Sequence, residues 1–179
     1  MASGLNWDGL SRLNHWLVAA AMVAMLVFGV YLHEFVPRGP EKGALIGIHK
    51  AVGVVVLIYG VWRVGYRLIQ GFLEETTAMP KWQSTLAKVV HWVLLISVIA
   101  MPLTGVLGSY FGGRDIDVFG LFTIASAMEP TKGLSDAFMG MHGVFAKMTI
   151  LALVLHVLGA IKHHYIDRDD TLKRMLGRA

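Results

Sequence analysis

The chain has 179 residues, of which 55% are hydrophobic and only 16% charged, well below the roughly 25% charged residues of an ordinary soluble domain. This composition excludes a typical water-soluble enzyme and favours one compact bundle of membrane helices. The net charge of +4 does not indicate a nucleic-acid partner, because the basic residues lie beside apolar stretches and not on one polar face. The absence of cysteine excludes disulfides, thiolate metal sites and cysteine-ligated iron–sulfur clusters.

Two transmembrane helices are predicted in the first half of the chain. Residues 12–33 form the first, because His15 is the only acidic or basic side chain between residues 13 and 32 and the run is too long for a signal-peptide core. Residues 44–68 form the second. Its uncharged centre, between Lys50 and Arg63, is shorter than a simple span, so these cations must reach the membrane interfaces or meet a buried anion.

Two more spans are predicted in the second half. Residues 84–107 form the third helix, with a kink expected at Pro102, and residues 137–164 form the fourth. The connection over residues 110–136 mixes glycine, aspartate and apolar residues and leaves room for a short interfacial helix. Residues 168–179 are a basic tail. The fold class is therefore an all-α integral membrane four-helix bundle, a single domain over residues 1–179.

The distribution of lysine and arginine predicts that both termini lie in the cytoplasm. Cytoplasmic segments carry the excess of positive charge. Ten cations belong to the side with the termini and six to the opposite side: Arg12, Arg63, Arg67, Lys81, Lys88, Lys162, Arg168, Lys173, Arg174 and Arg178 against Arg38, Lys42, Lys50, Arg114, Lys132 and Lys147.

Four histidines sort by depth into two pairs. His142 and His156 are 14 residues apart on the fourth helix, which places them about 40° apart around the axis and ~21 Å apart along it. A porphyrin iron with two imidazole ligands needs one histidine on each side of the ring. His49 lies at the depth of His142, near the outer face, and His15 lies at the depth of His156, near the inner face. We therefore predict two b-type haems.

The same 14-residue interval recurs in the first two helices. From His15 the step lands on Gly29, and Gly53 and Gly60 lie near the ligand direction on the second helix. Glycine keeps a helix surface free of bulk beside a flat macrocycle, although rows of small residues also occur in ordinary helix packing. On the second helix the step lands on Arg63, which is predicted to bind haem propionates.

The other histidines have weaker assignments. His33 is expected to meet water. His91 lies on the third helix at the inner level and is an alternative ligand to His15 or His156, although the shared face of the fourth helix favours the latter. His163 and His164 close the fourth helix, where positive charge suits a helix C-terminus; a role at a quinone pocket is the alternative.

The pattern resembles the bacterial cytochrome b561 family, which is related to the haem-binding subunits of nickel hydrogenases. The resemblance covers nearly the whole chain, and its motifs are SRLNHW at residues 11–16, GIHK at 47–50, HHY at 163–165 and DTL at 170–172, with His142 and His156 at their spacing. It implies the same two histidine pairs, two non-covalent b-type haems and a multi-pass protein of the bacterial inner membrane.

The resemblance also implies a function. Some stand-alone members oxidise superoxide on the outer side and pass the electrons to ubiquinone, so we expect a superoxide:ubiquinone oxidoreductase, with Lys50 beside the outer ligand to steer an anion. The alternative is a haem-b membrane anchor that passes electrons from a hydrogenase or dehydrogenase partner to quinone. A histidine-lined metal transporter without haem is a third reading, which an absorption spectrum would separate from the others. Membrane lipid, quinone and a donor, either superoxide or a redox protein, are the expected partners.

Overall fold

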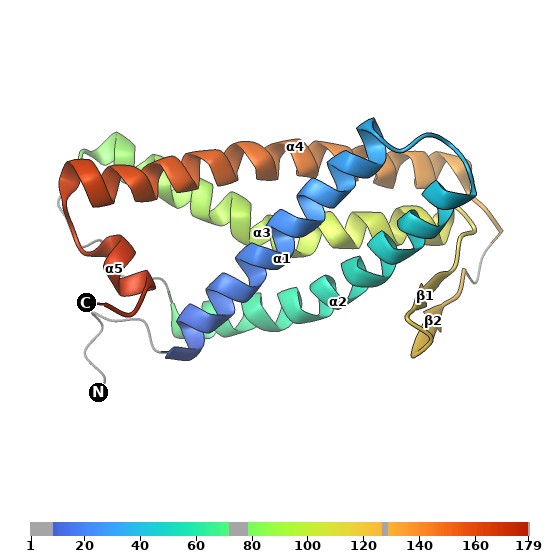
Figure 1. The fold of residues 1–179 in the computed structure, drawn as a ribbon, viewed down its shortest axis with the longest axis horizontal. Helices are drawn as coiled ribbons and strands as arrows, with labels where there is room; N and C mark the ends of the chain where they lie inside the picture. Colours follow the sequence, from blue (N-terminus) through green and yellow to red (C-terminus); the bar gives the residue numbers. More distant parts are fainter. Residues whose placement is uncertain (1–8, 72–78, 127–128, 179) are drawn as a thin grey trace.

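The computed structural model describes residues 9–71, 79–126 and 129–178. Four long helices make up most of the molecule (Figure 1). They are α1 (Gly9–Glu34), α2 (Pro40–Gln70), α3 (Lys81–Phe111) and α4 (Lys132–Lys162). Each of the first three contains its predicted range and extends beyond it, because helical structure continues past the apolar run into polar residues. The fourth begins five residues earlier than predicted. It ends at Lys162 and passes into a π-helical turn, η1 (His163–Asp167), followed by α5 (Thr171–Met175).

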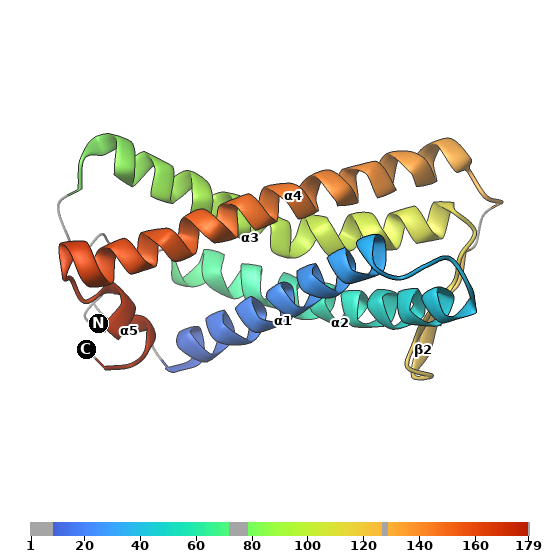
Figure 2. The same cartoon turned by 45° about the horizontal axis from the view of Figure 1, so that its top comes forward.

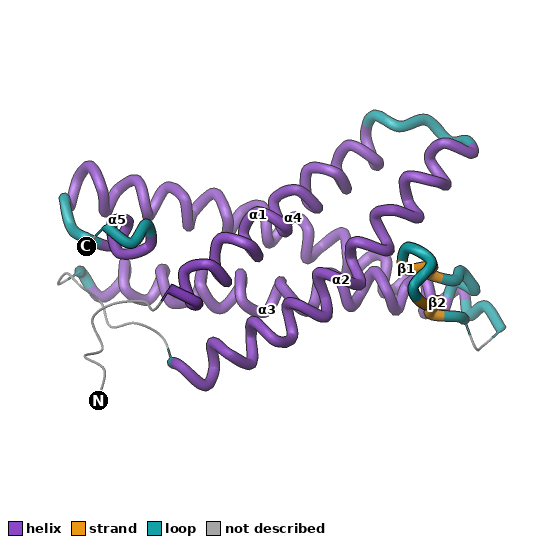
Figure 3. Tube along the Cα trace, turned by 60° about the horizontal axis from the view of Figure 1, so that its bottom comes forward, coloured by secondary structure: helices purple, strands orange, loops and turns teal. Residues whose placement is uncertain are grey.

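The helices run up and down between two ends of an elongated bundle, and loops and strands lie at those ends (Figure 3). The start of α1 and the C-terminal helix α5 lie at one end, here named the terminal end, and α1 crosses the bundle diagonally (Figure 1). The opposite end, here named the hairpin end, carries the strands β1 (Ile116–Val118) and β2 (Phe122–Ile124). A hydrogen bond joins α5 to α1: Trp16 Nε1 donates to the backbone carbonyl of Met175 over 3.0 Å.

The outer surface of the bundle is apolar, as expected of a membrane protein. All four helices are long and apolar enough to cross a bilayer, and large side chains such as Val27, Ile58 and Leu151 are about 60% or more exposed. Lipid tails are the natural solvent for such a surface, since helices satisfy their own backbone hydrogen bonds. The predicted integral membrane four-helix bundle is therefore confirmed.

A small apolar core lies between the two histidine levels. It consists of the buried side chains Met22, Leu26, Val56, Val98 and Met101 from α1, α2 and α3. Met22, Val56 and Val98 lie midway along the 14-residue intervals that separate the two levels. The core therefore lies between the two histidine pairs, and the interior of the bundle on its other side from the hairpin is here named the terminal-end compartment.

A bend in α3 brings α2 into close contact with it (Figure 2). Pro102 lies inside α3 and has no N–H to donate to the carbonyl of Val98, one turn earlier. The backbone of α2 approaches there: a Cβ on Gly60 would lie 2.7 Å from Val98 Cγ1 and 3.0 Å from Val98 O. Gly60 therefore serves helix packing, and its predicted position beside a haem is wrong.

We expect Gly60→Ala to destabilise the protein. Its new methyl group would overlap Val98, and overpacking of this kind costs about 1–3 kcal/mol. Gly65→Ala is the matched control, because a Cβ there meets nothing within 4 Å and alanine favours helix. Thermal unfolding in detergent should show a lower midpoint for the first variant only; equal midpoints would mean that α2 and α3 are less tightly packed than described.

The connection before α4 contains a β-hairpin where the sequence left room for a short helix. β1 pairs antiparallel with β2, with Ile116 opposite Ile124 and Val118 opposite Phe122. Ile116 and Val118 are each 1% exposed and pack against Val54 of α2. The segment is extended because alternate residues meet α2, and this long-range contact stabilises strands too short to be recognised from local sequence.

Candidate functional site

The four histidines predicted as ligands form two pairs, one toward each end of the bundle. His49 of α2 and His142 of α4 have ring centres 6.3 Å apart, and His15 of α1 and His156 of α4 have ring centres 6.2 Å apart. A metal ion lies about 2 Å from an imidazole nitrogen, so two imidazoles that share one iron have centres about 6 Å apart. Both pairs have this spacing, and they are the pairs predicted from helical depth.

The backbone of α3 orients one of these rings. His142 Nδ1 lies 2.8 Å from Met101 O, and because a carbonyl can only accept, Nδ1 carries the proton and donates. The other ring nitrogen, Nε2, is then free to bind a metal, which is the usual arrangement of a ligating histidine. On the opposite ring, His49 Nδ1 is buried and has no hydrogen-bond partner among the described residues.

A cavity of about 430 Å³ lies against the hairpin-end pair and is lined by residues of all four helices. Its lining includes Gly29, Gly53 and Gly105. A Cβ on Gly105 would lie 3.2 Å from His142 Cε1, and one on Gly29 would lie 3.4 Å from His49 Cε1. Each imidazole thus packs against a glycine of a neighbouring helix, which leaves the cleft beside it free for a flat group.

Gly105 did not emerge from the sequence, although a signal for it was present. It follows His91 by 14 residues on α3, just as Gly29 follows His15 on α1. The two helices therefore carry the same pattern, a histidine at one level and a glycine at the other. A 14-residue step from His91 along α3 therefore predicts Gly105, just as the same step from His15 predicts Gly29.

His91 belongs to the same compartment as the terminal-end pair. Its ring centre is 5.3 Å from that of His156, with the planes 71° apart. This distance is shorter than the separation of about 6 Å across a shared iron, whereas His15 and His156 match it. The spacing favours His15 over His91 as the partner of His156.

Two arginines of α2 are buried in the terminal-end compartment. Arg63 is 8% exposed and Arg67 is 7% exposed, and both are within electrostatic range of His15. Arg63 Nε is buried with no hydrogen-bond partner among the described residues. A buried guanidinium is costly unless an anion accompanies it, so this compartment is suited to a ligand that carries carboxylates.

A second unpaired donor lies near the same histidine. Asn14 is 1% exposed, and its Oδ1 accepts a hydrogen bond from Tyr59 OH over 2.7 Å. Asn14 Nδ2 has no partner within the described part of the chain. Tyr59 lies one helical turn before Arg63. The two donors without a partner, Asn14 Nδ2 and Arg63 Nε, therefore both lie near the level of His15. The sequence did not indicate Asn14 or Tyr59, whose polar contact joins two helices.

Two cations line the cavity at the hairpin end. Lys50 Nζ donates to the backbone carbonyl of Asp115 over 2.6 Å, and Arg114 Nη2 donates to Gly108 O over 3.1 Å and to Ser135 Oγ over 3.2 Å. Both side chains border the cavity that contains His49 and His142. Their hydrogen-bond partners are neutral oxygens. The carboxylate of Asp115 is within electrostatic range of Lys50, but two cations stand against this one carboxylate, so a net positive charge beside the cavity can attract an anion.

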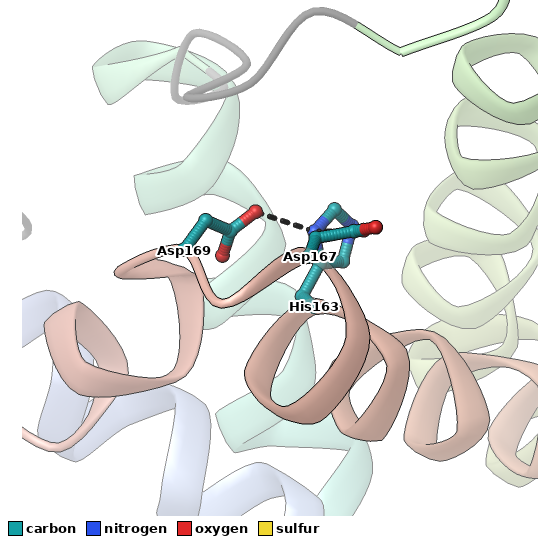
Figure 4. Close-up of side chains that lie close together, drawn as sticks. All are labelled: His163, Asp167 and Asp169. Carbon is teal, nitrogen blue, oxygen red and sulfur yellow. Dashed lines mark hydrogen bonds and ion pairs between the residues drawn. The ribbon is translucent and has the colours of Figure 1, made fainter.

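Ion pairs close the terminal end of α4 (Figure 4). His163 Nδ1 lies 2.7 Å from Asp169 Oδ2 and 3.4 Å from Asp167 Oδ2. These three residues could in principle hold a metal ion, but Lys162 Nζ already binds Asp167 over 2.6 Å. His163 is the C-cap residue of α4, where the sequence predicted a cap, and its ring also contacts Asp169 in the next turn. His164 Nδ1 is buried with no partner in the described ranges.

Comparison with known proteins identifies the family. The family model for prokaryotic cytochrome b561 matches residues 6–178. The chain belongs to the prokaryotic cytochrome b561 family. It is 30% identical over 179 residues to cytochrome b561 homolog 2 of Escherichia coli (strain K12), covering 95% of this chain and 90% of that protein. It is 32% identical over 165 residues to a protein of Yersinia pestis named "Probable superoxide oxidase CybB", covering 90% of each.

Membership of the cytochrome b561 family makes this chain a multi-pass haem protein of a bacterial membrane that takes part in electron transfer. The residues present are chemically suited to b-type haem: imidazole pairs at ligand spacing, a glycine-lined cavity and a buried, unpaired guanidinium nitrogen. The absence of cysteine from the chain agrees with a b-type haem, which is held without covalent thioether bonds.

Proposed function

We propose that this cytochrome takes electrons from superoxide at the hairpin end and delivers them to ubiquinone at the terminal end by way of two b haems. The observation that carries the proposal is the presence of one histidine pair toward each end, with ring centres 6.3 Å and 6.2 Å apart. His49 and His142 hold one haem, and His15 and His156 hold the other. Two haems at these positions can carry electrons across a membrane only if the two ends of the bundle face opposite sides of that membrane.

The reaction balances with two superoxide anions for each quinone. Each superoxide loses one electron and leaves as dioxygen, and ubiquinone takes up both electrons and two protons to become the quinol. When bound, the haems supply reversible one-electron chemistry at each level. The hairpin end then faces outward and both termini lie in the cytoplasm of a bacterium, in its inner membrane, as the excess of cations at the terminal end favours.

The residues of the chain have separate roles in this proposal. His142 is held by Met101 O through Nδ1, which leaves its other ring nitrogen available to bind the iron that it would share with His49. Lys50 and Arg114 border the cavity at the hairpin end and attract a small anion toward it. Arg63 stabilises the propionates of the haem at the terminal end. The name of the Yersinia pestis relative is consistent with superoxide as the donor.

The purified protein should contain two non-covalent haems per chain. A pyridine hemochrome assay against a quantitative amino-acid analysis measures this ratio, and acid–acetone should extract all of the haem because the sequence has no cysteine. One haem per chain in a well-folded preparation would contradict the assignment of two ligand pairs.

Superoxide should reduce the haems of the purified protein far faster than the buffer background, and ubiquinol should accumulate in liposomes that contain ubiquinone. Lys50→Gln should slow haem reduction roughly threefold to tenfold and weaken its dependence on ionic strength, since one attractive charge is lost. Lys132→Gln is the matched control: Lys132 is exposed at the same end and pairs with Asp136. If superoxide reduces the wild type no faster than background, the donor is another molecule and an anchor role for a partner enzyme gains support.

A further inference from the structure

The hairpin has an apolar tip that the redox sites do not use. Phe119 is 56% exposed, Leu121 is 81% exposed and Phe122 is 47% exposed. The turn is closed by Leu121 N–H, which donates to Val118 O over 3.0 Å. Phe119 and Gly120 have φ of 53° and 72°, a conformation that suits glycine or asparagine and disfavours phenylalanine. A large apolar side chain is thus displayed at a position that costs backbone energy.

The tip lies alongside the membrane helices and not beyond them. A cavity of about 320 Å³ separates Phe119 from the stretch of α2 that includes Ala44, Gly47 and Ala51. These residues follow the start of α2 at Pro40 by about 6–16 Å of helical rise. The 31 residues of α2 measure about 46 Å, against roughly 30 Å for the hydrocarbon layer. The tip is therefore level with the boundary between headgroups and acyl chains.

The direction of the hairpin takes its tip away from the bundle. The two strands project sideways past α2, transverse to the long axis (Figures 1 and 2). Their inner face is fixed on α2 through Ile116 and Val118 and through the bond of Lys50 to Asp115 O. The exposed apolar tip is thus continuous with the lipid-facing surface of the helices.

Neighbouring polar groups limit the depth of the tip. Asp117 is exposed and accepts hydrogen bonds within the hairpin, from Gly120 N over 3.1 Å and from the hydroxyl of Thr123 over 3.5 Å. A carboxylate and the ammonium of Lys50 tolerate the headgroup region but not the hydrocarbon centre. Aromatic and leucine side chains beside charged groups are typical of segments that lie in the interface.

We propose that Phe119, Leu121 and Phe122 insert into the interfacial region of the lipid leaflet at the hairpin end and anchor the hairpin there. Anchoring the hairpin also holds one wall of the cavity beside His49 and His142, because Ile116 of the hairpin and Arg114 before it line that cavity. The occupant of the apolar surface is lipid, and the inference does not depend on the donor or the acceptor of electrons.

Single-cysteine labelling tests the proposal, because the natural chain has no cysteine. Leu121→Cys carries a nitroxide spin label in nanodiscs of phosphatidylcholine and phosphatidylglycerol, and collision rates with oxygen and with a water-soluble nickel chelate are compared. Val27→Cys, on the exposed face of α1, and Arg38→Cys, in the exposed loop between α1 and α2, provide the lipid and water references. An intact haem spectrum verifies the fold of each variant.

The measured quantity is the ratio of the collision rate with oxygen to the collision rate with the nickel chelate. This ratio should be severalfold higher for the label at position 121 than for the label at position 38, and should approach the ratio at position 27. A ratio equal to that at position 38 would place the tip in water and overturn the proposal. Dipolar broadening that disappears on dilution with unlabelled protein would also overturn it, because the tip would then contact a second copy of the chain. Phe122→Cys provides the same readout if the first variant loses its haem spectrum.

Discussion

Replacing His142 by alanine is expected to remove the haem at the hairpin end and to leave the haem at the terminal end in place. The reason is that in the proposed arrangement each iron has its own pair of imidazoles, and the two pairs lie on opposite sides of the apolar core that includes Met22 and Val98. Haem content should fall from two per chain to one, and redox titration should show a single midpoint. His49→Ala should give the same result, because it removes the other ligand of the same iron.

The matched control for these variants is His33→Ala. His33 borders the same cavity, but its side chain is 85% exposed and contacts Glu34 over 2.8 Å. It belongs to neither histidine pair, so its loss should leave both haems. The result that would contradict the pairing is the loss of both spectral components from a His142 variant that still purifies as a monodisperse, helical protein. Loss of both together with aggregation would instead show that the bundle requires its cofactors to fold.

The parts of the structure that follow from local sequence were predictable. The number of membrane helices follows from apolar length, since a bilayer of fixed thickness demands a minimum run of residues. The depth of each histidine then follows from its distance along its own helix. The spacing of His142 and His156 fixes their common face because helical rotation accumulates regularly.

The parts that depend on contacts between helices were not predictable. Spacing alone does not fix the rotation of a helix about its axis, so the sequence left Gly60 open between a position beside a cofactor and helix packing; in the structure it packs on Val98. The choice between His15 and His91 requires distances across the bundle, 6.2 Å against 5.3 Å from the ring centre of His156. The hairpin forms because Ile116 packs against Val54 of α2, a residue that is distant from it in the sequence.

Arg63→Leu should lower the midpoint potential of the haem at the terminal end and leave the other nearly unchanged. Reduction adds one negative charge at the iron, and a nearby cation favours the reduced state. For charges about 8 Å apart at an effective dielectric constant of 20, the interaction is about 2 kcal/mol, equivalent to roughly 90 mV for one electron. A propionate that takes up a proton in response would offset part of this, so we expect a fall of about 50–90 mV. The other level is farther from Arg63 by a 14-residue rise of about 21 Å, so its shift should be small.

Arg63→Lys is the informative companion, since it keeps the charge but loses the planar fork that binds carboxylates in two places. It should retain most of the potential of the wild type, whereas a purely steric role for the side chain would make the two variants alike. The pH dependence of the same midpoint adds a second readout: in Arg63→Leu a propionate left without its partner should titrate nearer neutrality, so the midpoint should vary more with pH than in the wild type. If Arg63→Leu leaves both midpoints, their pH dependence and the haem content unchanged, the unpaired Nε faces something other than a propionate, and the arginine stabilises the bundle without tuning its redox chemistry.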